Sequence, residues 1–327
     1  MSNSQPHVLL AGATGYIGRA VAERLLSRGI PHSLLQRRAP SSPSTSELRE
    51  TIVSTVGSEL ESALQGTRPS VVISCLASRS GVANDAWAID YAANARLLKV
   101  AAGLGAEHFI LLSALCVQKP KLAFQHAKLA FERELIESPI RHSIVRPTAF
   151  FRSLSGQVAR VQSGKPFMVF GDGTLTACKP IGEADLADYL IDCIDRPERH
   201  ERILPIGGPG AALTPIDQAT ILFRLLDREP KFRRVPVAVL GAAATVLGTL
   251  GHISRVARSK AELARIGRYY ATESMLVWDD KQQRYDADAT PSTGSRTLED
   301  HYRYVLENGL AGHEAQEHRL FDRASAD

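Results

Sequence analysis

The most constraining feature of this chain is a run of three evenly spaced glycines close to its amino terminus. Residues 7–11 form a short apolar run that suits a buried strand, and it leads directly into Gly12, Gly15 and Gly18. A helical pattern follows and stops at Gly29. Glycines between a strand and a helix let the backbone turn tightly and approach a pyrophosphate, and the helix start directs its N–H groups at that charge. The order strand, glycine loop and helix therefore predicts a dinucleotide-binding site.

Alternation of strand-like and helix-like segments in the first half of the chain predicts a parallel sheet covered by helices. The strand-like segments are residues 7–11, 32–35, 50–56, 70–75, 108–113 and 142–146. A helix at 183–193 and a strand at 202–206 return to this sheet. We expect an α/β fold, a Rossmann-type doubly wound parallel sheet with a smaller, mainly C-terminal substrate lobe. The expected division is a dinucleotide-binding Rossmann domain at 1–150, to which 181–207 return, and a substrate-binding lobe at 151–180 and 208–327.

The end of the second predicted strand indicates which coenzyme this domain prefers. An NAD-dependent enzyme commonly places a carboxylate there to accept a hydrogen bond from the ribose 2′-hydroxyl. This chain has Arg37 and Arg38 instead. Guanidinium groups pair with phosphate oxygens, so the two arginines favour NADPH, although solvated surface arginines would give the same pattern. The residues expected to bind NADPH are Gly12, Thr14, Gly15, Tyr16, Ile17, Gly18, Arg37, Arg38, Leu76, Ala77, Lys128 and Pro147.

A predicted helix after the fifth strand carries a lysine but lacks the tyrosine that commonly accompanies it. Many short-chain dehydrogenase/reductases have a serine at the end of this strand and a Tyr-x-x-x-Lys helix, whose tyrosine gives a proton to a carbonyl oxygen. Here the serine is Ser113, the lysine is Lys128, and the tyrosine position is Phe124, which has no proton to give. Positions four apart share a helix face, so we expect Lys128 to hold the nicotinamide-side ribose while Phe124 packs beside it. Ser113 and Lys128 are the expected catalytic residues.

The missing tyrosine favours a carbon–carbon double bond over a ketone as the hydride acceptor. Hydride adds to one carbon of a polarised alkene, and the negative charge spreads into a conjugated system. A weak acid then protonates the other carbon. We therefore expect apolar and aromatic residues to dominate the site.

Bulk composition excludes several other classes of function. The 327 residues include 39 basic and 35 acidic ones, and the net charge of +4 is too small and too evenly spread to predict nucleic-acid binding. The four cysteines show no C-x-x-C pairing, so we expect free thiols in a reducing compartment. Residues 313–318 hold two histidines and two glutamates in a spacing that matches no zinc motif. We expect a solvated tail there and no metal site.

One uncharged segment stands apart from this pattern. Residues 235–254 carry no formal charge, and the arginines that flank them are Arg233, Arg234, Arg255 and Arg258. Glycines and threonines make the segment less apolar than a membrane span. We expect a helix packed in the protein core. A helix that lines an apolar ligand pocket or rests on a membrane surface is the alternative.

Several short blocks are more specific than the glycine loop. They are residues 74–79, 85–91, 112–120, 124–128, 144–151, 170–173, 177–180, 266–275 and 285–291. Together they resemble one family, the NADPH-dependent divinyl chlorophyllide 8-vinyl reductases of phototrophs, over about residues 7–310. This family belongs to the atypical, NmrA-like short-chain dehydrogenase/reductases, of which the G-x-x-G-x-x-G spacing is typical, and it too has phenylalanine in place of the usual tyrosine. The resemblance implies reduction of an 8-vinyl group to ethyl in chlorophyll or bacteriochlorophyll biosynthesis.

The substrate that this resemblance implies is a flat, apolar magnesium tetrapyrrole with a carboxylate, either divinyl chlorophyllide or protochlorophyllide. It implies a large apolar pocket, and the residues expected to bind substrate are Phe150, Phe151, Arg152, Met168, Lys179, Tyr269 and Tyr270. Arg152, Lys179 or Arg268 would pair with the propionate. The candidates for the proton donor are Cys178, Lys179, Tyr269 and Tyr270.

Two other functions fit part of the pattern. One is reduction of another conjugated alkene, and the other is an NmrA-like regulator that senses NADP(H) without catalysis. Plant members of the family carry a transit peptide, and residues 1–6 lack that character. We therefore expect a bacterial protein in the cytoplasm, at most peripheral to the photosynthetic membrane. The sequence carries no signal for an oligomeric state.

Overall fold

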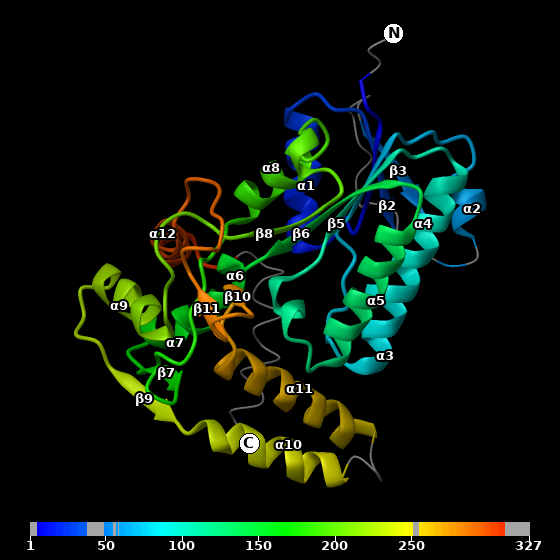
Figure 1. Cartoon of the computed structure of the whole chain (residues 1–327). Helices are drawn as coiled ribbons and strands as arrows, with labels where there is room; N and C mark the ends of the chain where they lie inside the picture. The colour runs from blue at the N-terminus through cyan, green and yellow to red at the C-terminus, as the bar shows by residue number, and fades with distance from the viewer. Residues whose placement is uncertain (1–4, 38–48, 55–56, 58, 251–254, 311–327) are drawn as a thin grey trace.

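The computed structural model describes residues 5–37, 49–54, 57, 59–250 and 255–310. Its centre is a seven-stranded sheet in the order β3-β2-β1-β4-β5-β6-β8, in which neighbouring strands are parallel (Figure 1). The strands are β1 (Val8–Ala11), β2 (His32–Gln36), β3 (Arg49–Val53), β4 (Val71–Ser74), β5 (His108–Leu112), β6 (Arg141–Pro147) and β8 (Arg202–Ile206). The strand order reverses between β1 and β4, which is where sheets of this kind bind ligands. The predicted doubly wound parallel sheet is confirmed.

Helices cover both faces of this sheet. One face carries α1 (Tyr16–Ser27) and α8 (Glu183–Asp192), and the other carries α2 (Leu60–Ala63), α4 (Asn94–Gly103) and α5 (Ala123–Glu137) (Figure 1). Along β1, Val8 and Leu10 pack into the first layer, whereas Leu9 and Ala11 pack into the second. Because side chains of a strand alternate between faces, a strand buried on both sides is apolar at every position.

The helical run at residues 83–103 is interrupted in its middle. The structure has three consecutive segments there, α3 (Ala83–Ala86), the π-helical η1 (Trp87–Ala93) and α4. A π-helical turn has one extra residue, so it changes which side chains face the neighbouring elements. Here η1 packs against α5.

The second lobe has its own hydrophobic core. Its elements are α6 (Phe151–Leu154), η3 (Ser155–Gln157), α7 (Val158–Gln162), β7 (Phe167–Phe170), α9 (Pro215–Leu225), β9 (Phe232–Val235) and α12 (Leu298–Asn308). The largest side chains buried among them are Phe151, Phe167, Phe223 and Tyr302. Strands β7 and β9 pair in parallel, and β10 (Val277–Asp279) pairs with β11 (Arg284–Asp286) in a short hairpin. A turn η4 (Pro197–Arg199) precedes β8. The lobe boundaries given above stay a prediction.

The uncharged segment forms an exposed helix, so the expectation that it packs in the core is wrong. α10 (Val237–Leu250) pairs with α11 (Arg255–Thr272) in a helical hairpin and is its outer member (Figure 1). Val239 and Val246 are 53% and 59% exposed. Among the described elements, α11 is the main neighbour of α10, and one neighbouring helix can bury only one side of another. Among the described residues, no helix is both long and apolar enough to span a bilayer.

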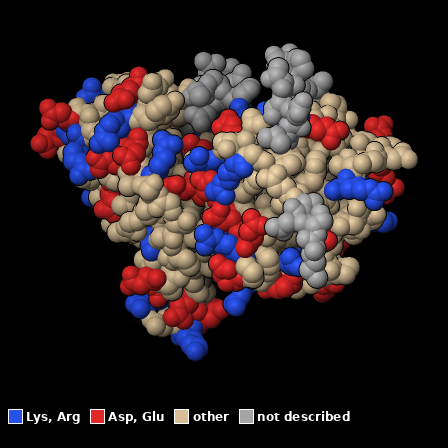
Figure 2. All heavy atoms as spheres, turned by 90° about the horizontal axis from the view of Figure 1, so that it is seen from above, with Lys and Arg blue, Asp and Glu red and all other residues tan. Residues whose placement is uncertain are grey.

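Surface charge, cysteines and possible metal ligands can be compared with the expectations from the sequence. On the face that Figure 2 shows, basic and acidic side chains are interspersed rather than gathered by sign. All four cysteines are unpaired. Residues 313–318 lie outside the described residues. Within those that the structure describes, no group of three or more His, Cys, Asp and Glu side chains is arranged to hold a metal ion.

Candidate active site

The glycine loop lies at the carboxyl edge of the sheet, between β1 and α1. Gly12 has a φ of 83°, a left-handed conformation that side chains disfavour. A Cβ atom on Gly12 would lie 2.7 Å from the carbonyl carbon of Cys75, and one on Gly18 would lie 2.1 Å from the carbonyl oxygen of Gly12. Within the loop, Thr14 is exposed and Ile17 is buried. Neither glycine can be replaced without moving backbone, so the loop keeps the tight course that lets a pyrophosphate approach.

The first turn of α1 presents backbone N–H groups without a competing side chain. Its N-cap is Gly15, which makes no side-chain cap, and the first turn contains no acidic residue. The Tyr16 hydroxyl donates to Glu183 at 2.6 Å, which ties this turn to α8. A helix start of this kind favours an anion, because the helix dipole and the terminal N–H groups both point at it. The residues present therefore fit a dinucleotide pyrophosphate.

The coenzyme preference rests on the residues that follow β2. This strand ends at Gln36, and Arg37 is exposed directly after it. Arg38 lies outside the described residues. The strand end carries no carboxylate that would repel a 2′-phosphate. The part of each arginine in binding that phosphate stays a prediction.

Lys128 lies where the loops after β4 and β5 approach α5. Its side chain is 11% exposed, and its Nζ atom lies 2.9 Å from Oδ1 of Asp90 in η1. Burial raises the pKa of the Cys75 thiol to about 12, and the nearby charge of Lys128 acts in the opposite direction. The same charge acts on the buried thiol of Cys116, in η2 (Leu115–Gln118) after β5. An ammonium between these two strand ends suits the ribose on the nicotinamide side of a dinucleotide.

Asp90 is the site residue that the sequence reasoning missed. Its side chain is 1% exposed, so it is a buried carboxylate whose charge is balanced by Lys128. The signal available in the sequence was an acid in the middle of a helix that packs on the sheet. Its position next to Lys128 depends on the π-helical turn, and the residue pattern does not predict such a turn.

Phe124 packs and does not face a polar partner. It is 8% exposed, in a cluster with Leu122, Ala127 and Tyr269. A Cβ atom on Gly81 would lie 3.3 Å from Cδ1 of Phe124, so the ring touches the loop after β4. The position that would hold a tyrosine is therefore part of an apolar wall.

Ser113 and Pro147 are held by contacts within the Rossmann domain. The Ser113 hydroxyl donates to Glu132, whose carboxylate also pairs with Arg146. This serine thus joins an ion pair between α5 and β6, and its hydroxyl makes no hydrogen bond to Lys128 among the described contacts. The predicted catalytic role of Ser113 gains no support from this geometry. Pro147 is buried at the end of β6, beside Ile206 of β8.

Two predicted substrate residues gather around Tyr16 instead of lining the wall near Lys128. The rings of Phe150 and Tyr16 lie 6.2 Å apart between centroids. The guanidinium carbon of Arg152 lies 5.2 Å from the centroid of the Tyr16 ring, and Arg152 is 8% exposed. Both residues therefore lie beside the first turn of α1.

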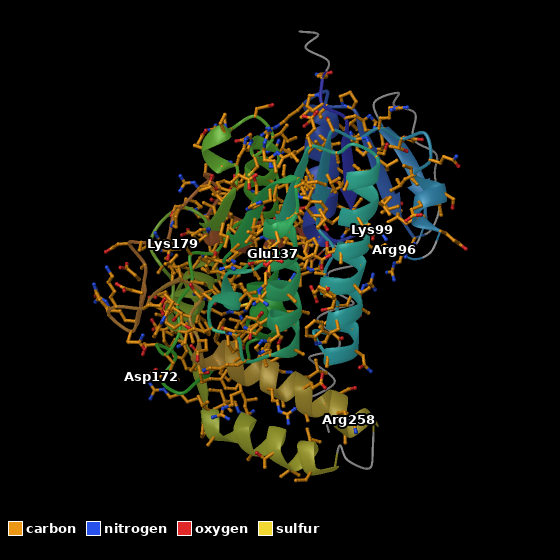
Figure 3. The ribbon with its side chains drawn as sticks, turned by 45° about the vertical axis from the view of Figure 1, so that its right-hand side comes forward. Arg96, Lys99, Glu137, Asp172, Lys179 and Arg258 are labelled. Atoms are coloured by element: carbon orange, nitrogen blue, oxygen red, sulfur yellow. The ribbon has the colours of Figure 1, made fainter. Side chains whose placement is uncertain are left out.

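Three other predicted substrate residues lie in the second lobe. Phe151 is 1% exposed, and its ring lies 5.3 Å from that of His301, so it belongs to the lobe core. Lys179, which is labelled in Figure 3, donates from Nζ to the carbonyl oxygen of Thr290 at 2.9 Å. Met168 is half-buried in β7. Of these, Phe151 has no surface to offer a ligand.

Tyr269 and Tyr270 differ in what their hydroxyls contact. Tyr269 is buried, and its hydroxyl donates to the carbonyl oxygen of Cys116 at 2.9 Å and to that of Lys119 at 3.2 Å. Burial raises the pKa of Tyr269 above its ordinary value. Tyr270 is 43% exposed, and its hydroxyl lies 4.0 Å from the Cys116 sulfur. The first tyrosine holds the lobe in place, whereas the second keeps an exposed side chain beside it.

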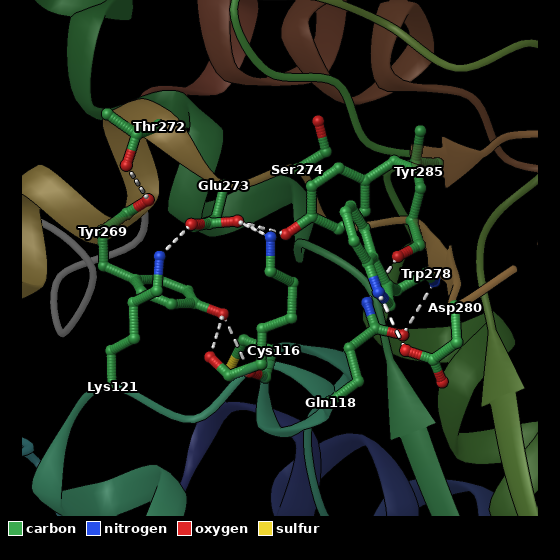
Figure 4. Close-up of polar contacts among 12 residues, drawn as sticks. Cys116, Gln118, Lys121, Tyr269, Thr272, Glu273, Ser274, Trp278, Asp280 and Tyr285 are labelled. Carbon is green, nitrogen blue, oxygen red and sulfur yellow. Dashed lines mark hydrogen bonds and ion pairs between the residues drawn. The ribbon is translucent and has the colours of Figure 1, made fainter. Parts of the chain in front are cut away.

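A charged cluster fastens the turn after β5 to the second lobe. The Glu273 carboxylate forms ion pairs with Lys119 and Lys121 and accepts a hydrogen bond from the Tyr285 hydroxyl (Figure 4). Burial would raise the pKa of Glu273, but these hydrogen bonds outweigh it and lower the pKa to about 2. Lys119 also lies 3.9 Å from the centroid of the Trp278 ring. The turn that leads into α5, and hence to Lys128, is fixed by the lobe.

A glycine loop and an uncapped helix start at the point where strand order reverses are the means by which Rossmann folds hold a dinucleotide. The chain is therefore a dinucleotide-binding protein of this class. A family of NAD(P)H-binding proteins matches residues 12–197. The fold is similar to that of the Bordetella bronchiseptica enzyme WbmG in complex with NAD, with a TM-score of 0.67 and 14% identity over 94% of this chain and 96% of that one.

Curated relatives identify the narrower family. The chain is 47% identical over 338 residues to the divinyl chlorophyllide a 8-vinyl-reductase of Oryza sativa subsp. indica, with 98% of this chain and 84% of the relative covered. It is 44% identical to the protein of the same name from Arabidopsis thaliana, with 95% and 79% covered. The chain belongs to the divinyl chlorophyllide a 8-vinyl-reductase family, which confirms the resemblance seen in the sequence.

These relatives correct one expectation. Both carry names that place them in the chloroplast. They point to a plastid, and the expectation of a bacterial cytoplasmic protein is wrong. The inference depended on the composition of residues 1–6, which is too short a stretch to define a compartment.

Proposed function

We propose that this chain reduces the 8-vinyl group of divinyl chlorophyllide or protochlorophyllide to an ethyl group, with NADPH as the hydride donor. The observation that carries the proposal is the similarity to vinyl reductases over nearly the whole chain, second lobe included. The phenylalanine at position 124 supports it, because a vinyl group conjugated to a macrocycle needs no phenol to polarise it.

The coenzyme would be held along the carboxyl edge of the sheet, where its nicotinamide supplies the hydride. The loop at 12–18 and the first turn of α1 would bind the pyrophosphate through backbone N–H groups. Arg37 would pair with the 2′-phosphate. Lys128 would donate hydrogen bonds to the hydroxyls of the nicotinamide-side ribose, while Phe124 and its apolar cluster exclude water from the reacting atoms.

The contacts of the four candidate proton donors favour Tyr270. Tyr269 gives its proton to the Cys116 carbonyl, and the Lys179 ammonium donates to that of Thr290. Cys178 is buried, and its thiol donates to the carbonyl oxygen of Leu213 at 3.9 Å. Burial raises the pKa of Cys178 and of Tyr270 alike, so the pKa does not separate these two. Tyr270 is partly exposed beside the cluster that contains Phe124. We assign it the protonation of the second vinyl carbon.

The exposed helix α10 would place the protein against a lipid surface. It has no charged residue, and Val239 and Val246 project from it. Exposed Arg233, Arg234 and Arg265 lie on the flanking elements β9 and α11. An apolar face beside basic side chains suits an anionic membrane. Flotation with anionic vesicles tests this: the protein should float, and Val239→Asp with Val246→Asp should not. Equal behaviour of the two proteins would refute it.

The test of the activity is incubation of the purified protein with NADPH and divinyl chlorophyllide while the Soret band is followed. Conversion of vinyl to ethyl shortens the conjugated system, so a blue shift is expected, faster with NADPH than with NADH. An unshifted band in a protein that binds NADPH would overturn the proposal. It would favour another alkene substrate or a coenzyme sensor.

A further inference from the structure

We infer that Asp90 is a positioning residue, which fixes the Lys128 ammonium at the place where it meets the nicotinamide-side ribose. The inference rests on the coenzyme assignment made above and concerns a residue for which the sequence pattern gave no role. It combines three observations: a widened helical turn, a buried ion pair and a contact to the loop after β4.

The side chain of Asn94 connects the widened turn to the sheet. Asn94 donates from Nδ2 to the carbonyl oxygens of Ile89 at 3.1 Å and Asp90 at 3.2 Å. Its Oδ1 accepts from the Ser74 hydroxyl at 2.6 Å, at the end of β4. The Asn94 side chain therefore connects two carbonyl groups of the π-helical turn to the end of β4. Such turns are frequent at functional sites because they re-aim side chains.

The side chain that this turn presents to α5 is a buried acid. Asp90 and Lys128 are 1% and 11% exposed, with 2.9 Å between Oδ1 and Nζ. A buried ammonium requires an opposite charge close to it, because the interior solvates it poorly. The buried thiols of Cys75 and Cys116 are also close to Lys128, but burial raises the pKa of both, so neither supplies a negative charge. Glu132 lies four positions on in α5, and its carboxylate pairs with Arg146. Asp90 therefore supplies the charge that keeps this ammonium in place.

Asp90 also contacts the segment along which the coenzyme is expected to lie. Its Oδ2 accepts from the backbone N–H of Ser78 at 3.4 Å, next to Leu76 and Ala77. One carboxylate thereby joins the ribose-binding lysine to the loop after β4. Since Phe124 has no proton to give, Lys128 is left with binding and orientation, and its location decides where the nicotinamide lies.

The test compares Asp90→Asn with Asp85→Asn in direct titrations of NADPH and NADH against the full-length protein. Asp85 starts the same helical run and accepts from Ser80, so its variant is a matched control. The ribose is common to both coenzymes, so Asp90→Asn should weaken both by the same factor, about tenfold. Asp90→Glu should recover part of the loss, and Asp85→Asn should stay within about twofold.

A double variant separates positioning from folding. If Asp90 acts through Lys128, then Lys128→Met with Asp90→Asn should bind NADPH as Lys128→Met alone does, because the effects of one pair are not additive. Removing both charges also leaves no buried charge unpaired, so this variant should fold even where Asp90→Asn does not. Parental binding by folded Asp90→Asn, or additive losses in the double variant, would overturn the inference. Neither measurement uses a pigment, so failure of the vinyl-reductase proposal would leave this result standing.

Discussion

The Tyr269 hydroxyl donates to the carbonyl oxygen of Cys116 at 2.9 Å and so joins α11 to the turn after β5. Its neighbour Tyr270 makes no comparable bond to the backbone among the described contacts, since its hydroxyl lies 4.0 Å from the Cys116 sulfur. Adjacent residues of one helix thus have different tasks. One fixes the second lobe, and the other, which we propose as the proton donor, is 43% exposed.

Replacing each tyrosine by phenylalanine should separate these tasks. Tyr269→Phe should lower the free energy of unfolding by about 1 kcal/mol, the usual value of a lost hydrogen bond. Tyr270→Phe should leave that energy nearly unchanged but lower kcat by about 100-fold, as the loss of a general acid does. Urea denaturation and the Soret assay measure the two effects. The reverse assignment, with kcat lost only in Tyr269→Phe, would contradict the account.

The phosphate assignment predicts a difference between coenzymes. Arg37→Ala combined with Arg38→Ala should weaken NADPH by about tenfold or more and leave NADH nearly unchanged, since only NADPH carries the 2′-phosphate. Fluorescence titration of both coenzymes measures this. An equal loss for NADPH and NADH would mean that the arginines act on the fold or on a part the two coenzymes share.

Restoring the common tyrosine should bring no gain in rate. Phe124→Tyr puts a hydroxyl into a position that is 8% exposed and packed against Gly81. We expect vinyl reduction to continue at the same or a lower rate, with a stability loss of about 1–3 kcal/mol from overpacking. Steady-state kinetics and thermal melting give the two values. A collapse of the rate in a folded variant that still binds NADPH would reveal a role for this ring beyond packing.

Two buried histidines should make the fold sensitive to acid. Burial, with the charges of His200, Arg141 and His142, lowers the pKa of His108 to about 3, and burial lowers that of His301 to about 4. Both are neutral in the folded protein, whereas an unfolded histidine takes up a proton near pH 6.5. Stability is therefore complete above about pH 6.5 and falls as the pH is lowered toward these values.

The expected loss is about 1.4 kcal/mol per histidine for each pH unit below 6.5. Urea denaturation at pH 7.5 and 5.5 should therefore give free energies of unfolding that differ by about 3 kcal/mol. His108→Gln with His301→Gln should reduce the difference. Equal stability of the parent protein at both pH values would show that these side chains accept protons while folded.

The parts of the fold that the sequence predicted are those that depend on neighbouring residues. Strand β1 could be recognised because residues 8–11 are all apolar and lead into Gly12. The lysine and the phenylalanine of α5 could be placed on one face because helical spacing is fixed. Such patterns are local, so they can be recognised without knowledge of the tertiary contacts.

The parts that were missed depend on contacts between distant segments. Asp90 meets Lys128 from a π-helical turn whose carbonyl groups bond to Asn94, and Asn94 in turn bonds to Ser74 of a distant strand. Ser113 has its partner nineteen positions away, in Glu132. The helix α10 is exposed because few of the described elements pack against it, and composition does not predict the number of neighbours. In each case tertiary packing determines which residues meet, and it overrides the local sequence pattern.

The most direct test of the account is the fate of the transferred hydride. Divinyl chlorophyllide is incubated with the protein and NADPH deuterated at the transferable C4 position, and the pigment is analysed by mass spectrometry and NMR. Hydride added to the terminal vinyl carbon leaves the negative charge on the carbon that is conjugated to the macrocycle. The account therefore predicts a product whose new 8-ethyl group carries one deuterium, in its terminal methyl. A reduced pigment without deuterium, or an intact vinyl group in the presence of bound NADPH, would contradict it.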